Sequence, residues 1–230
     1  MNDPYVYEGT EVLINKAGIR DQKKLDDYES TMVQLALIDI FRKNENFSTI
    51  DTIFEIHARL FSEVYEWAGK KRTVNIVKYE QVLDGMSVQY SDCSKIDPDL
   101  SKIENKLAEI DWSTMSIDNK ITMMAEMTAD VWRVHAFREG NTRTVSVFLH
   151  SLMREAGLKL NSGFISTNAK YFRNALVMAS LGEYRENQYL ENILKGAVSD
   201  IKTPDSNSDR YRTINGYDVT RYKYNYHKTE

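Results

Sequence analysis

Five residues that could carry out chemistry together fall within nine positions of the chain, in the stretch HAFREGNTR. They are His135, Glu139, Gly140, Asn141 and Arg143. A histidine has an ordinary pKa of about 6.5, so His135 is suited to take a proton from an attacking hydroxyl. Glu139 offers the hard oxygen ligands that suit a divalent cation bridging phosphate oxygens.

The residues after Glu139 are suited to hold an anion. Gly140 permits a positive φ, so successive backbone N–H groups of residues 140–143 can point into one concavity. A helix is expected to begin near Thr142, and a helix N-terminus favours negative charge. Arg143 can add a bidentate guanidinium to the same anion. The stretch indicates a phosphate-bearing substrate, Mg²⁺ and a general base.

Residue by residue, a plainer interpretation stays open. A His-x-x-x-Glu spacing is often a surface or structural pair, and Gly-Asn is often a turn. As ligands, His135 and Glu139 have no obvious third partner, which argues against a structural zinc site.

The elements that must position this stretch are predicted to be mainly helices. Only 3 prolines and 10 glycines occur in 230 residues, and these are the residues that cost most inside helices. A short strand or hairpin is predicted at 72–79 (RTVNIVKY), where β-branched residues lie between glycines. Apolar spacing predicts helices over 21–43, 49–67 (with Ser48 as N-cap), 98–110, 117–134, 142–156, 167–181 and 186–196. The chemical stretch then lies in a loop between two helices.

Composition excludes several classes of protein. With 30 basic and 34 acidic residues the formal charge is −4, so general nucleic-acid binding is not expected. The single cysteine, Cys93, excludes an intrachain disulfide framework. We expect a soluble, intracellular protein, because the sequence starts without a secretory signal and no apolar run approaches the roughly 18 residues of a membrane span. We expect an N-terminal arm and helix over 1–47, a core domain over 48–196 and a polar, tyrosine-rich tail over 197–230.

The motif stretch resembles the signature of the Fic family, His-x-Phe-x-(Asp/Glu)-Gly-Asn-x-Arg, which continues to a second arginine after two further residues. Residues 66–78 (EWAGKKRTVNIVK) resemble the family's Trp-Ala-Gly segment, which leads into a β-hairpin flap over the active site. Residues 3–26 resemble the N-terminal arm of bacterial Fic toxins. The likeness covers roughly residues 3–196.

The resemblance implies a mainly α fold, with the motif loop between two central helices and a short β-hairpin flap. It also implies transfer of AMP from ATP to a Tyr, Thr or Ser hydroxyl of a target protein. The implied roles are general base for His135, Mg²⁺ ligand for Glu139, anion hole for Gly140, Asn141 and Thr142, phosphate-tail contact for Arg143, core anchor for Phe137, and target clamp for the flap residues Val77 and Lys78.

The chain departs from the family pattern at three positions. Ala136 replaces a frequent proline, Thr142 replaces the usual glycine, and Ser146 stands where the second arginine belongs. In the family that arginine contacts the γ-phosphate, and losing a charge-assisted contact costs on the order of 1.5–3 kcal/mol. A Fic-like phosphate-binding module without transferase activity therefore remains an alternative. Transfer of a different phosphate-containing group is another, although phosphate-transferring relatives carry a lysine in the loop.

Partners and location follow from the same resemblance. The family's inhibitory motif, Ser/Thr-x-x-x-Glu followed by Gly or Asn, is not intact in this sequence. Either a small antitoxin protein supplies the inhibitory glutamate, or Ser146 leaves no arginine for it to pair with. We expect a bacterial cytoplasmic enzyme with a protein target. Of the remaining candidates, His57 is predicted to be a packed histidine, and Lys70, Lys71 and Arg72 to form a solvated basic cluster.

Overall fold

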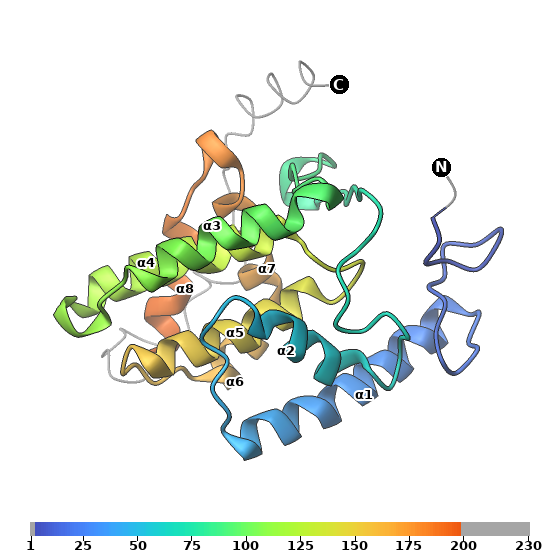
Figure 1. The fold of residues 1–230 in the computed structure, drawn as a ribbon, viewed down its shortest axis with the longest axis horizontal. Helices are drawn as coiled ribbons and strands as arrows, with labels where there is room; N and C mark the ends of the chain where they lie inside the picture. Colours follow the sequence, from blue (N-terminus) through green and yellow to red (C-terminus); the bar gives the residue numbers. More distant parts are fainter. Residues whose placement is uncertain (1–2, 199–230) are drawn as a thin grey trace.

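The computed structural model describes residues 3–198, and helices dominate this range (Figure 1). The predicted mainly α class is confirmed. The predicted tail lies outside the described residues from Ser199 onward. The described helices are α1 (Gln22–Lys43), α2 (Thr52–Phe61), α3 (Ile96–Ala108), α4 (Ile117–Val134), α5 (Asn141–Glu155), α6 (Ser162–Thr167), α7 (Ala169–Ala179) and α8 (Gln188–Ala197).

Capping residues set several of these boundaries. Asp21 accepts a hydrogen bond from the backbone N–H of Lys24 and begins α1. The side chain of Ser116 does the same for Asn119 at the start of α4. The predicted N-cap at Ser48 is wrong, because α2 begins only at Thr52, after Asp51. The chain after α2 forms tight turns instead of more helix.

The core lies around α4 and α5, which follow one another through the motif loop. Helix α5 packs against α2 and α4, while α4 also contacts α3, α7 and α8. Buried side chains on α4 include Ile121, Met124, Met127 and Trp132. Because α4 is covered on several sides, its C-terminal end and the loop that follows are held firmly in place.

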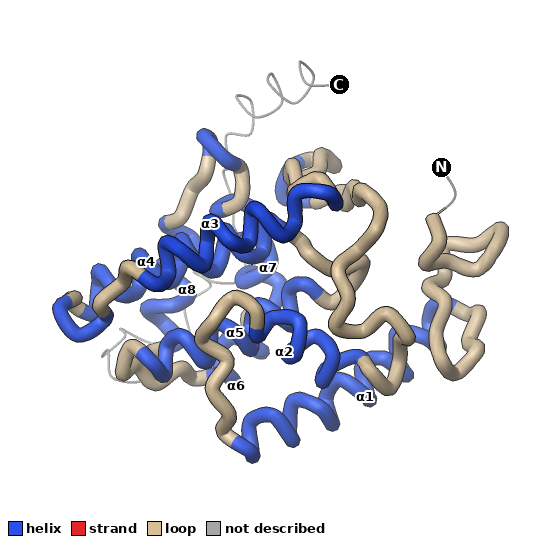
Figure 2. The backbone as a smooth tube through the Cα atoms, viewed as in Figure 1, coloured by secondary structure: helices blue, strands red, loops and turns tan. Residues whose placement is uncertain are grey.

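The strand predicted over 72–79 is not formed. This segment runs as extended loop, and Figure 2 draws no strand in the described part of the chain. The chain reverses through a 3₁₀ turn at Gln81–Leu83, and the backbone N–H of Glu80 pairs with the carbonyl of Met86 at 3.0 Å. Further back, the N–H of Lys78 pairs with Ser87 Oγ at 3.2 Å, so a side chain takes the place of a strand partner. We call residues 72–90 the flap loop.

Within residues 3–198, no helix is both long enough and apolar enough to cross a membrane.

Candidate active site

The motif loop is a sharp link between α4 and α5. Both ends of the loop have left-handed backbone conformation: His135, directly after α4, has φ 50°, and Gly140, directly before α5, has φ 83°. Asn141 closes the loop: its Oδ1 accepts from the N–H of Phe137 at 3.0 Å, and its Nδ2 donates to the Phe137 carbonyl at 2.8 Å. The buried Asn141 side chain is therefore structural, and only its backbone N–H remains for an anion.

His135 is buried with a defined tautomer. Its Nδ1 lies 3.1 Å from the carbonyl of Trp132, which only accepts, so Nδ1 carries the proton and Nε2 carries the lone pair. The ring packs against Tyr90, with 4.0 Å between centroids. Burial, with the positive charge of Lys78, lowers the pKa of His135 well below 6.5. His135 is therefore neutral near pH 7, as a general base must be.

Glu139 is held as a carboxylate by surrounding donors. Lys78 Nζ from the flap loop lies 2.7 Å from Oε2, and the N–H of Gly140 donates to Oε1 at 3.0 Å. Burial alone would raise the pKa of Glu139. The charge and hydrogen bond of Lys78, with the Gly140 N–H, outweigh burial and lower the pKa to about 2. The expected place of the Gly140 N–H in the anion hole is thus taken by Glu139.

The N-terminus of α5 has the backbone geometry that an anion site requires. Helix geometry leaves the first N–H groups of α5, those of Asn141, Thr142 and Arg143, without partners in the helix. Gly140 precedes them with no side-chain cap. A Cβ at Gly140 would lie 2.4 Å from two ring carbons of Phe61, so the close approach requires glycine here. Negative charge is favoured at this point by the helix dipole.

Arg143 extends from the same turn and is paired with a carboxylate on α1. Its Nη1 lies 2.6 Å from Glu29 Oε1, and its guanidinium lies over the Phe61 ring at 4.7 Å from the centroid. Glu29 also accepts a hydrogen bond from the hydroxyl of Tyr65 at 2.5 Å. Helix α1 thus holds the motif arginine, a contact that the motif itself does not disclose.

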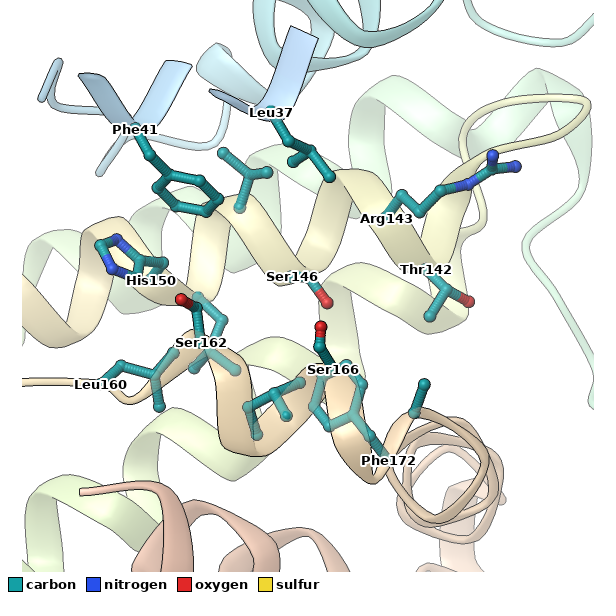
Figure 3. Close-up of a pocket in the computed structure, with 14 residues that line it drawn as sticks. Leu37, Phe41, Thr142, Arg143, Ser146, His150, Leu160, Ser162, Ser166 and Phe172 are labelled. Atoms are coloured by element: carbon teal, nitrogen blue, oxygen red, sulfur yellow. The ribbon is translucent and has the colours of Figure 1, made fainter. Parts of the chain in front are cut away.

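Thr142 and Ser146, two of the three departures from the family pattern, line one pocket. The pocket measures about 240 Å³ and lies among α1, α5, α6 and α7. In Figure 3 the Ser146 hydroxyl points toward that of Ser166, with Leu37 and Phe41 of α1 on the opposite wall. Ser146, which stands at the position of the second motif arginine, therefore faces a mostly apolar pocket next to the anion site.

The two flap residues named from the sequence point in opposite directions. Val77 is 60% exposed, whereas Lys78 turns inward to Glu139. The alternation continues with exposed Tyr79 and buried Glu80, as expected for extended chain. A role for Val77 in target binding stays a prediction. Lys78 contacts Glu139 of the motif in this structure, and its predicted role in target binding likewise stays a prediction.

Sequence reasoning missed the part played by Arg72. Expected on a solvated face, it is 1% exposed, and its Nε donates to the His135 carbonyl at 2.8 Å. The guanidinium also contacts the carbonyls of Val74, Ser91 and Val134. A cation is favoured at the C-terminus of α4 because unpaired carbonyls gather there. No signal in the local sequence separates Arg72 from its exposed neighbours.

Two other segments support the loop from outside. His57 is packed, as expected, and stacks on Phe137 with 3.9 Å between centroids. Its Nδ1 accepts from the N–H of Gly69 at 2.8 Å, so its Nε2 donates to the Glu139 carbonyl at 3.0 Å. From the N-terminal arm, Asp3 pairs with Arg138 at 2.7 Å. The apolar run around His57 predicted its burial, but nothing in the sequence pairs Asp3 with the motif.

Comparison with known proteins agrees with this geometry. Residues 47–153 match the model of the Fic/DOC family. The chain is 30% identical over 187 residues to the probable protein adenylyltransferase y4lH of Sinorhizobium fredii, covering 80% of this chain and 91% of that protein. It is 32% identical over 194 residues to the protein adenylyltransferase VbhT of Bartonella schoenbuchensis, covering 84% of this chain but only 38% of VbhT.

Solved structures show the same fold. BepC, a VirB-translocated effector of Bartonella tribocorum determined with bound AMPPNP, superposes with a TM-score of 0.71 at 22% identity. The match covers 88% of this chain and 97% of that one. A Bartonella quintana Fic domain with bound ADP gives a TM-score of 0.69 at 22% identity, covering 88% and 95%. The fold, the motif and the extent of the match to y4lH place this chain in the Fic/DOC family.

Proposed function

We propose that this chain is a protein adenylyltransferase that moves AMP from ATP to a hydroxyl side chain of a target protein. The observation that carries the proposal is the state of His135, which is neutral, buried and fixed with its Nε2 lone pair available in the motif loop. A module that only binds phosphate needs no such base. Two protein relatives named as adenylyltransferases support the choice of transferred group.

Each residue of the motif then has a defined task. His135 Nε2 takes the proton from the target hydroxyl, whose oxygen attacks the α-phosphate as the bond to pyrophosphate breaks. The N–H groups of Asn141 and Thr142 stabilise the charge on the phosphate oxygens, and Arg143 binds the phosphate tail. Gly140 contributes by its conformation, because its own N–H already pairs with Glu139.

Glu139 fits a role in holding Mg²⁺. Its carboxylate is ionised and reachable, with 34% of the side chain exposed. The described residues contain no group of three or more His, Cys, Asp or Glu side chains that could hold a metal by themselves. One carboxylate together with substrate phosphates is an ordinary environment for Mg²⁺, which would neutralise phosphate charge there. Mg²⁺ would compete with Lys78 at this carboxylate, because Lys78 Nζ contacts Oε2 and the Gly140 N–H contacts Oε1.

The resemblance of residues 3–26 to the arm of bacterial Fic toxins suggests the biological setting. We propose a bacterial cytoplasmic protein with a hydroxyl-bearing protein target, and a small antitoxin protein as its inhibitor. In this proposal the antitoxin supplies the inhibitory glutamate that the sequence lacks; the alternative is that Ser146 leaves no arginine for such a glutamate to pair with. We also propose that residues 1–47 form the N-terminal arm and helix, residues 48–196 the core domain and residues 197–230 the tail.

The test uses the full chain with Mg²⁺ and ATP labelled separately at the α- and γ-phosphates, in a bacterial lysate. Protein labelling from the α-label alone, abolished by His135→Ala, is the expected result. Lys102→Ala is the control, because Lys102 is exposed on α3, pairs with Asp99 and should leave labelling unchanged. Labelling from the γ-label would instead establish phosphotransfer. ATP binding without labelling from either position would favour the binding module.

A further inference from the structure

A second arginine reaches the anion site from α7. Arg173 Nη1 lies 3.3 Å from the side-chain oxygen of Thr142, in the first turn of α5. Arg143 follows Thr142 directly in the chain. Two guanidinium groups, one from α5 and one from α7, thus flank the helix N-terminus that offers its N–H groups to an anion.

The flap loop orients Arg173. Glu80 is buried, with 6% of its side chain exposed, and its Oε1 lies 2.7 Å from Arg173 Nη2. The contacts to Glu80 and Thr142 engage two of the five N–H donors that a guanidinium carries. Because 40% of the Arg173 side chain is exposed, the group remains accessible to a ligand. An arginine held at one edge and accessible at another is suited to bind a phosphate oxygen.

The position of Arg173 complements the missing motif arginine. Thr142 and Ser146 are four residues apart, on one face of α5, and both line the same pocket. Ser146 brings only a hydroxymethyl group to this face. Thr142, in turn, is fixed by a hydrogen bond from Trp132 Nε1 at 2.9 Å. The guanidinium of Arg173 therefore lies one helical turn from the place where α5 lacks a cation.

We infer that Arg173 is a phosphate-binding residue of the nucleotide site and supplies from α7 the cation that Ser146 does not. This inference rests on the proposed function, in that it takes ATP as the ligand. The positive charge of Arg173 also reaches the loop, where it is among the influences that lower the pKa of His135. The ion pair between Glu80 and Arg173 connects the flap loop directly to this phosphate site.

Calorimetric titration of the full chain with Mg-ATP tests the inference without requiring AMP transfer. Arg173→Ala should raise the Kd for ATP by about 10- to 100-fold, the value of one charge-assisted contact. The double variant Arg173→Ala/Ser146→Arg should recover most of that loss, because it restores a guanidinium to the same face. Arg185→Ala removes an ion pair to Asp130 on α4 and should leave the Kd unchanged.

Two results would overturn the inference. An ATP Kd within twofold of the unmodified protein in Arg173→Ala would show that this guanidinium does not bind phosphate. A loss that Ser146→Arg does not recover, with thermal unfolding of Arg173→Ala shifted down, would assign Arg173 a merely structural role beside Glu80. A chain that binds ATP through Arg173 but transfers no AMP would contradict the proposed function and leave this inference standing.

Discussion

Replacing Gly140 by alanine should damage the site for two separable reasons. The backbone at Gly140 is left-handed (φ +83°), which costs an alanine about 1–2 kcal/mol. The new Cβ would also lie 2.4 Å from Cε2 and Cζ of Phe61, and overpacking of this kind costs about 1–3 kcal/mol. Together we expect Gly140→Ala to lower the free energy of unfolding by about 2–5 kcal/mol.

The chain offers a matched control for the first of these costs. Gly157 has nearly the same backbone conformation (φ +75°), and nothing lies within 4 Å of a Cβ built there. Gly157→Ala should therefore show only the conformational cost of about 1–2 kcal/mol. Urea unfolding of both variants at one pH measures the difference, which isolates the contact with Phe61.

A double-mutant cycle completes the test. Phe61→Leu removes the distal ring carbons, so in the Gly140→Ala background it should cost less than in the unmodified chain. In Gly140→Ala the rate of AMP transfer should fall even under conditions where the variant is fully folded. The reason is that displacement of the α5 N-terminus misplaces the anion site. Equal losses of stability in Gly140→Ala and Gly157→Ala would refute the argument that Phe61 dictates glycine in the motif.

Three further predictions concern charge. In the pH–rate profile, activity should be lost on the acid side only well below pH 6.5, because the pKa of His135 is lowered. Lys78→Met should move this loss to higher pH, because the charge of Lys78 helps to lower that pKa. An unchanged profile in Lys78→Met would contradict this coupling. Burial lowers the pKa of His57 to about 4, so the unfolded chain binds more protons between pH 6.5 and 4 and stability falls as the pH drops through this window. His57→Gln should reduce that loss by roughly 3 kcal/mol in urea titrations at the two pH values, and an unchanged loss would count against it. Glu29→Gln should raise the KM for ATP about fivefold with a smaller change in kcat, because Glu29 holds Arg143 in place; a lowered KM would mean that Glu29 obstructs the phosphate.

The sequence was sufficient for features that local patterns determine. The apolar face of α4 and its Ser116 cap give a helix whose bounds match the prediction. The motif loop was placed between two helices for the same reason. Short α6 was not predicted, since its six residues, Ser162–Thr167, are too few to establish a helical period. The expected strand at 72–79 was wrong because its backbone groups pair with loops and side chains.

Contacts between segments that are remote in the chain could not be predicted from the sequence. Glu29 and Arg143 are far apart in the chain, and so are Glu80 and Arg173, yet each pair meets at the site. Nothing in the local sequence of Glu29 distinguishes it from other acidic residues on α1. Spacing within the motif predicted which groups could act, but not which remote carboxylates would hold them.

The carboxylates of Glu29, Glu80 and Glu139 have different roles at the site. An arginine has five N–H donors, so Arg143 and Arg173 can keep Glu29 and Glu80 while binding a phosphate oxygen through other donors. The ammonium of Lys78 is a compact charge on Oε2 of Glu139, where Mg²⁺ would compete with it. Glu29 and Glu80 are therefore positioning residues that stay in place, whereas Lys78 would compete with Mg²⁺ for Glu139. Because Lys78 lies two residues before Glu80 in the flap loop, this competition concerns the Lys78 side chain alone, while Glu80 and Arg72 keep the loop on Arg173 and on the His135 carbonyl.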